Sequence, residues 1–299
     1  MSYRAATRGR ETPLLWFVPV AVFLGLFMVF PLFDVIRLSF TTASIVEPDY
    51  TYSLESFAKV FGDNDFLWSL SITGIFVAAN SGLQIPVGLA IALAVHVGLQ
   101  KGVRGSIVAR TAVLTAWIVP GVLVGILWRT LLTTTSTGIV NYFVESLGFE
   151  RIAFLSTPLY AVISIIVANI WAGAGFSMIL QYAGLQRIPA ELYEVSRVDG
   201  ASAWQQFVHI TLPQLKPILF INLVLITISS FNTFDMIATL TAGGPAGTTE
   251  VLTLSAYYQV FQNWKMGRAA ATAVVLLVIT LGMTAIYYRM FQLDEDIAD

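Results

Sequence analysis

Six apolar stretches, each long enough to cross a lipid bilayer as a helix, divide this chain almost from end to end. The hydrocarbon core of a bilayer is about 30 Å thick and takes about 20 apolar residues in helical form. The middle four stretches carry Asn, Gln, Ser and Thr, which indicates that they face protein or water. We therefore predict an all-α, polytopic membrane protein, a single integral domain over residues 1–299. Its six transmembrane helices are expected at residues 14–40, 66–98, 107–132, 158–185, 214–241 and 268–291.

The composition agrees with a membrane protein and excludes several other classes. Of the 299 residues, 57% are hydrophobic and 11% are charged, about half the charged share of an ordinary soluble domain, which is about 25%. The formal net charge is -2 and the 16 Lys and Arg residues form no stripe, so we expect no nucleic-acid partner. The chain has no cysteine, which excludes disulfides, thiolate metal sites and cysteine nucleophiles. We expect lipid as its solvent and no metal site.

Basic residues predict the orientation, because they are enriched in short cytoplasmic loops. Six spans place both termini on the same side. If that side is the cytoplasm, the loops 41–65, 133–157 and 242–267 are extracytoplasmic, and they are rich in Asp and Glu. The basic residues on the cytoplasmic side are then Arg4, Arg8, Arg10, Lys101, Arg104, Arg110, Arg187, Arg197, Lys216 and Arg289.

A long polar insert, residues 186–213, separates two of the apolar stretches. Its sequence has the features of a folded segment. Pro189 suits the first position of a helix, where its missing N–H would be unpaired anyway, and Glu191 favours the positive end of the helix dipole. Gly200 ends this helix, because glycine takes the left-handed cap conformation without steric cost.

A second short helix is predicted after this glycine. Ser202 and Gln205 have the spacing of a capping box, in which each side chain bonds to the backbone N–H of the other residue. Pro213 and Pro217 are expected to end this helix before the fifth span. Two short helices joined at a glycine would form a rigid plug for a partner's groove, whereas an ordinary helical connector is the alternative.

The insert resembles the cytoplasmic EAA loop of ABC importer permeases, the loop that docks into an ATPase subunit. The matching residues are Glu194, Asp199, Gly200, Ala201, Ile210, Leu212 and Pro213. Val195 and Ser196 depart from the two alanines that are usual in this motif. Other segments resemble the sugar-importer branch of the same family, typified by the larger maltose permease subunit and the glycerol-phosphate permeases. They include Phe17–Pro19, Gly138–Asn141, Gly184–Gln186, Phe234–Asp235 and Leu240–Pro245.

This resemblance implies the type I importer permease fold and a transport function. The chain would be a non-catalytic subunit that forms half of a translocation pathway in a prokaryotic plasma (inner) membrane. Its expected partners are a second permease, two cytoplasmic ATPase subunits and an extracytoplasmic sugar-binding protein. ATP and Mg are expected in the ATPase, so the chain itself would hold no cofactor.

The resemblance also assigns roles to residues of the insert. Contacts with the ATPase are expected from Glu191, Glu194, Val195, Val198, Asp199, Gly200, Ala201 and Trp204. Among these, Gly200 would supply the bend. Asp199 has a second interpretation, as a simple cap of the helix end.

Polar residues inside the predicted spans are candidates for sugar contacts. Neutral amides match the hydroxyl groups of a sugar, and an aromatic ring can stack on its C–H face. The candidates are Asn80, Gln84, Asn169, Trp171, Asn232 and Asp235. For each of them, bonding between neighbouring helices is the competing interpretation. Because the spans contain no basic cluster, a neutral disaccharide or oligosaccharide is favoured over a polyol phosphate.

Two further features leave alternatives open. Arg129 and Asp235 lie near the outer ends of their predicted spans, where they would form a gate pair or reach separately to the interface. Residues 136–148 alternate turn residues with apolar ones, which suggests a short amphipathic helix at the membrane interface or a plain connecting loop.

Two other functions compete with the transport subunit. A membrane enzyme has little support, because the chain has two His residues, His96 and His209, and lacks a zinc-protease motif. An ion-coupled secondary transporter or channel would need no ATPase, but such proteins often carry inverted repeats and ionisable groups at mid-membrane depth. The sequence has neither feature.

Overall fold

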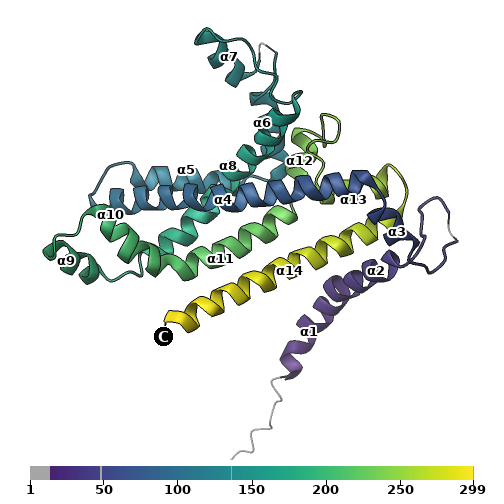
Figure 1. The fold of residues 1–299 in the computed structure, drawn as a ribbon, viewed down its shortest axis with the longest axis horizontal. Coiled ribbons are helices and arrows are strands. Elements are labelled where there is room, and N and C mark those ends of the chain that lie inside the picture. Colours follow the sequence, from purple (N-terminus) through teal and green to yellow (C-terminus); the bar gives the residue numbers. More distant parts are fainter. Residues whose placement is uncertain (1–13, 48, 136, 299) are drawn as a thin grey trace, which may run out of the picture.

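The computed structural model describes residues 14–47, 49–135 and 137–298, and the regular secondary structure of this part of the chain is helical apart from one isolated bridge between Thr41 and Tyr52 (Figure 1). The basic residues Arg4, Arg8 and Arg10, which contribute to the predicted orientation, lie outside the described residues. Five helical segments of the described chain are long and apolar enough to cross a membrane. They are α1–η1–α2 (Leu14–Leu24, Gly25–Val29 and Phe30–Ser39), α4 (Asn64–Gln100), α8 (Pro158–Leu185), α10–η2–α11 (Ala203–Gln206, Phe207–Thr211 and Leu212–Phe231) and α14 (Met266–Ala298).

The predicted third span is a pair of helices and not one continuous helix. Helices α5 (Ser106–Ile118) and α6 (Gly121–Leu131) meet at an angle of 105°, so the number of spans rises to six only if this bent pair counts as one. The bend follows from Pro120, which lacks a backbone donor and forces the preceding Val119 into an extended conformation. In Figure 1, α6 turns away from the direction of α5 and leads to α7.

The prediction for the fifth span, residues 214–241, is wrong at both ends. The spanning helix begins at Ala203, so Pro213 and Pro217 do not separate it from the insert. Pro213 lies in the first turn of α11, directly after the π-helical turn η2, and a wider turn there accommodates a residue without a backbone donor. The helix ends at Phe231, and the following residues form a separate short helix.

Short helices cap both ends of the long ones. The short helix that follows Phe231 is α12 (Asp235–Leu240). The remaining short helices of the described residues are α3 (Glu55–Phe61), α7 (Ile139–Ser146), α9 (Ala190–Val198) and α13 (Leu252–Phe261). The break before α12 is stabilised by Asn232 and Thr233, whose side chains donate to carbonyl groups in the last turn of α11. Figure 1 shows α9 and α10 at one end of α4, and α3 and α13 at the other.

Helices α4 and α8 form the centre of the bundle. Phe76 of α4 and Ile165 and Met178 of α8 are fully buried. The two backbones approach closely at Gly88, where a β-carbon would lie 2.5 Å from Cβ of Ser177. Small residues permit this close approach. The van der Waals packing that results holds the helices together in lipid, where the hydrophobic effect does not drive helices to associate.

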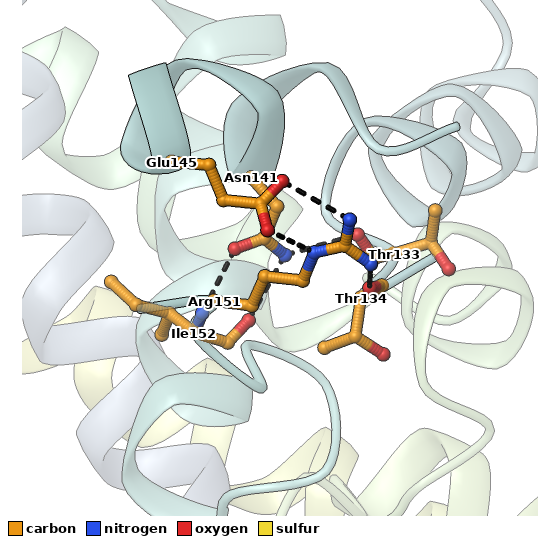
Figure 2. A network of polar contacts seen from close by, with 6 residues as sticks. All are labelled: Thr133, Thr134, Asn141, Glu145, Arg151 and Ile152. Atoms are coloured by element: carbon orange, nitrogen blue, oxygen red, sulfur yellow. Dashed lines mark hydrogen bonds and ion pairs between the residues drawn. The ribbon is translucent and has the colours of Figure 1, made fainter. Parts of the chain in front are cut away.

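A polar network attaches α7 to the end of α6 (Figure 2). The buried Asn141 donates from Nδ2 to the carbonyl oxygens of Thr133 (3.0 Å) and Ile152 (3.1 Å), and its Oδ1 accepts from Ile152 N (2.9 Å). Arg151 bonds to both carboxylate oxygens of Glu145, and this hydrogen-bonded guanidinium lowers the pKa of Glu145. Residues Ile139–Ser146 therefore form a helix and not a plain loop, while Ser136 lies outside the described residues.

We expect Asn141→Leu to release α7 without unfolding the bundle. The substitution leaves one N–H and two carbonyl groups without their partner, a loss of about 2–4 kcal/mol in the local unfolding free energy. The rate of proteolysis between residues 133 and 157 should therefore rise by at least about tenfold, since 1.4 kcal/mol is a factor of ten. Tyr142→Leu, at an exposed neighbouring position, is the matched control, and equal proteolysis of both variants would contradict the expected role of Asn141.

Candidate functional site

The loop between α8 and α11 folds as two helices joined at a glycine. Gly200 has a φ of +80° and follows Asp199, the residue that caps the end of α9, and the N–H of Ala201 donates to the carbonyl of Ser196 at 2.9 Å. This is the left-handed helix end that glycine accepts at low cost. Ser202 and Gln205 then form the predicted capping box at the start of α10.

Side chains on the inner face of α9 fasten it to the beginning of the fifth span. The hydroxyl of Tyr193 bonds to Oγ1 of Thr211 at 2.9 Å. Gln206 donates from Nε2 to Oγ of Ser196 at 2.9 Å and to the carbonyl of Tyr193 at 3.3 Å. Ser196, a departure from the alanine of the EAA motif, thus supplies a hydrogen bond between α9 and α10. These contacts fix the orientation of α9 relative to a spanning helix.

Tyr193→Phe should loosen α9 and leave the rest of the fold unchanged. The variant loses one hydrogen bond, worth about 1 kcal/mol, so the backbone amides of α9 should exchange with deuterium about fivefold faster. Hydrogen exchange read by mass spectrometry measures this change. Tyr142→Phe in the exposed α7 is the control, and unchanged exchange in α9 of Tyr193→Phe would show that the bond to Thr211 does not hold the loop.

The outer face of the loop is apolar and exposed. Val198 is 88% exposed, Trp204 is 70% exposed and Val195 is 61% exposed. Glu191, Glu194 and Asp199 are exposed around them, and the ion pairs found among the described residues lie elsewhere in the molecule. Asp199 caps the C-terminal end of α9 with its backbone N–H. Its carboxylate takes no part in this cap and can therefore contact a partner. Exposed apolar side chains surrounded by carboxylates form a surface suited to a protein partner.

A second feature lies inside the bundle, where α4, α5, α8 and α11 surround a cavity of about 340 Å³. Its polar groups are Gln84, Asn169, Ser229 and Ser230, and an aromatic wall faces them. The full lining is Gln84, Trp117, Asn169, Ala172, Gly173, Phe176, Leu225, Ile226, Ser229 and Ser230. The rings of Trp117 and Phe176 lie 5.4 Å apart.

The amides of the cavity are held in place by hydrogen bonds across helices. Gln84 of α4 donates to the carbonyl of Gly173 at 2.9 Å and to Oγ of Ser177 at 3.0 Å. Gly173 is required for this approach, because a β-carbon there would lie 2.6 Å from the Gln84 carboxamide. Asn169 donates to Oδ1 of Asn80 at 2.9 Å. Such pre-positioned amides and hydroxyls can exchange hydrogen bonds with a polar, uncharged ligand.

Comparison with known proteins shows the family. Residues 84–292 match the family described as "Binding-protein-dependent transport system inner membrane component", and this range includes α8, the loop of α9 and α10, and all of the cavity lining. The chain belongs to this family. It is thus a non-catalytic membrane subunit of an ABC importer, and the ion-coupled alternative is set aside.

Relatives and solved structures extend the match of this permease to almost its whole length. It is 31% identical over 297 residues to the trehalose/maltose transport system permease protein MalF of Thermococcus litoralis, covering 99% of this chain and 97% of the relative. It is 29% identical to the sulfoquinovosyl glycerol transport system permease protein SmoG of Agrobacterium fabrum, covering 95% and 91%. A chain of a bacterial ABC transporter involved in the import of the acidic polysaccharide alginate superposes with a TM-score of 0.80 at 25% identity, covering 93% and 94%. The predicted type I importer permease fold is confirmed.

Only two of the predicted substrate residues of the permease, Gln84 and Asn169, line the cavity. Asn80 is fully buried behind Asn169 and donates to the carbonyl of Phe76. Trp171 lies outside the lining, with its ring 6.1 Å from that of Trp128. Asn232, which bonds to the last turn of α11, also lies outside it. Sugar contact by these residues stays a prediction.

Asp235 lies where α12 packs on α6. A β-carbon on Gly121 would lie 2.3 Å from Oδ2 of Asp235, and one on Gly125 would lie 1.9 Å from Oγ1 of Thr239. Arg129 is eight residues beyond Gly121 on α6, about 12 Å at 1.5 Å per residue. No ion pair links Arg129 to Asp235 within the described chain, so the suggested gate pair is not formed in this conformation. The spacing of the two glycines is a signal for close helix packing that the sequence analysis missed.

The aromatic wall of the cavity was also missed. Trp117 and Phe176 come from different spans, and a single Trp or Phe in an apolar stretch carries no sign of the direction in which it points. Ser230 was missed for the same reason.

Proposed function

We propose that this permease imports a sugar and that the cavity beside Gln84 and Asn169 receives it. The observation that carries the proposal is the combination of neutral amides and hydroxyls with the ring pair of Trp117 and Phe176. Sugar hydroxyls need matched donors and acceptors, and a flat aromatic wall suits the C–H face of a pyranose. The names of the relatives, which include trehalose/maltose and sulfoquinovosyl glycerol systems, support a carbohydrate ligand. The cavity lining contains no Lys or Arg, which favours a neutral disaccharide or oligosaccharide.

The loop of α9 and α10 is proposed as the docking element for a cytoplasmic ATPase. Val195, Val198 and Trp204 would enter a groove of the partner, with Glu191 and Glu194 in polar contact around them. Because Tyr193 and Gln206 attach α9 to the fifth span, a movement of the ATPase pair would be transmitted to the helices that line the cavity. The complete importer would contain a second permease, two ATPase subunits and an extracytoplasmic sugar-binding protein.

In the proposed orientation, both termini and the α9–α10 loop face the cytoplasm of a prokaryotic cell. The absence of cysteine makes this testable with single-cysteine variants and a maleimide that does not cross membranes. In intact spheroplasts, Leu147→Cys on the outer side should react, whereas Val198→Cys should react only after the membrane is opened. The reverse pattern would contradict the orientation.

The function is tested by transport in proteoliposomes that contain the permease, its second permease and the ATPase. Uptake of trehalose and maltose, measured with an added sugar-binding protein, should require ATP and should not respond to a proton or sodium gradient. An acidic oligosaccharide of uronates serves as the contrasting substrate. Uptake of the acidic sugar alone would overturn the neutral-sugar assignment, and no ATP-dependent uptake of any carbohydrate would overturn the sugar function.

A further inference from the structure

The turn between α13 and α14 contains a tryptophan in a strained backbone conformation. Trp264 has a φ of +59°, in the left-handed region that bulky residues rarely adopt and that costs them free energy. Glycine would take this conformation without steric cost. The chain instead places its largest side chain there, and leaves that side chain 47% exposed.

Backbone hydrogen bonds explain the left-handed conformation at position 264, but they do not explain why a tryptophan occupies it. The carbonyl of Trp264 accepts from the N–H of Ile45 at 3.0 Å and from Oγ of Ser44 at 2.9 Å. The N–H of Gly267 donates to the carbonyl of Ala43 at 2.9 Å. These bonds attach the loop after α2 to the start of α14, and a glycine at position 264 would make the same ones. The side chain therefore has a role that offsets the strain.

The surroundings of this side chain are polar and carry charges of both signs. Trp264 lines a cleft of about 510 Å³ together with Glu47, Lys59, Lys265 and Arg268. Lys59 and Arg268 also line a second cleft, of about 570 Å³, so the two clefts form one continuous surface. A surface of this kind is unsuited to lipid chains. A half-exposed tryptophan surrounded by mixed charges is typical of the anchor residue of a protein interface.

We propose that this surface, defined by Trp264, Glu47, Lys59, Lys265 and Arg268, docks the extracytoplasmic binding protein, with Trp264 as the anchor. It belongs to the end of the molecule opposite α9 and α10, beside α3 and α13 (Figure 1). This assignment rests on the proposed function, because that function places this end outside the cell and requires a protein that delivers the sugar there.

Trp264→Gly separates the role of the side chain from that of the backbone, because it keeps the backbone hydrogen bonds and removes the strain. We expect the affinity for the binding protein to fall by at least about 30-fold, the change that corresponds to a hot-spot loss of about 2 kcal/mol. The thermal midpoint of the importer should stay the same or rise. The measurements use the complete importer in nanodiscs and the purified binding protein that supports maltose or trehalose uptake by the wild type.

Two further variants exclude a general disturbance of the turn. Trp264→Asn also accepts the left-handed backbone and should lose affinity in the same way, whereas Trp264→Phe keeps an aromatic ring and should retain most of it. If Trp264 instead anchors the protein in the membrane interface, Trp264→Gly will lower the thermal midpoint and leave the affinity unchanged, which overturns the proposal. A wild type that binds no sugar-binding protein overturns the proposed function and this surface together, while equal binding by wild type and Trp264→Gly overturns this surface alone.

Discussion

Val198→Asp is expected to abolish stable association of the permease with its ATPase while the membrane bundle stays folded. Val198 is the most exposed of the apolar residues on α9 and makes little contact with the permease itself. Burial of a carboxylate in an apolar groove without a partner costs several kcal/mol, and hot-spot losses of about 2 kcal/mol or more weaken binding by at least about 30-fold. Co-purification of the ATPase from mild detergent, and its permease-dependent ATP hydrolysis, measure the effect.

The control for this substitution is Val103→Asp. Val103 is also exposed and lies between α4 and α5, at the same end of the bundle but outside the loop of α9 and α10. Both variants add one negative charge at an exposed valine, so a general effect of charge would appear in both. Retention of the ATPase by both variants would show that α9 is not the docking element, and loss from both would assign the effect to the added charge. A lower thermal midpoint of Val198→Asp without ATPase present would indicate a fold defect instead.

Gly173→Leu is expected to block sugar transport with little effect on assembly. A side chain at this position enters the cavity and displaces the Gln84 carboxamide, which would lie 2.6 Å from its β-carbon. Overpacking of the space that the Gln84 carboxamide occupies costs about 1–3 kcal/mol, which corresponds to a loss of about 5- to 150-fold in sugar affinity or transport rate. Uptake in proteoliposomes measures the loss, and co-purification of the ATPase should remain at the wild-type level.

Gly74→Leu provides the matched control. Gly74 is a helical glycine of α4 that is exposed, and no atom lies within 4 Å of the place where its β-carbon would be. It therefore tests whether glycine-to-leucine exchange in a spanning helix impairs transport in general. Wild-type uptake by Gly173→Leu would show that the cavity is not on the sugar pathway, and equal loss by both variants would assign the effect to the helices.

Local features of the sequence predicted much of the loop that forms the proposed ATPase contact. Gly200 and the capping box of Ser202 and Gln205 act over three or four residues, so their effect on the backbone can be derived without knowledge of the fold. The fastening of α9 was not predicted, because it depends on Tyr193 meeting Thr211 and on Gln206 meeting Ser196 after the chain has turned. Pro213 misled for a related reason, since the π-helical turn that precedes it is not visible in residue types.

The sequence by itself determined that the chain is a helical membrane protein, where its apolar segments lie, and which family it resembles. Hydrophobicity and length are sums over neighbouring residues, and lipid requires every spanning backbone to satisfy its own hydrogen bonds as a helix. Only the tertiary structure decided which polar residues line the cavity. Asn80 and Asn169 are 89 positions apart and bond to each other, and Gln84 reaches the cavity because Gly173 leaves room for it. The direction of a side chain in a buried helix depends on the packing of its neighbours, which no local pattern records.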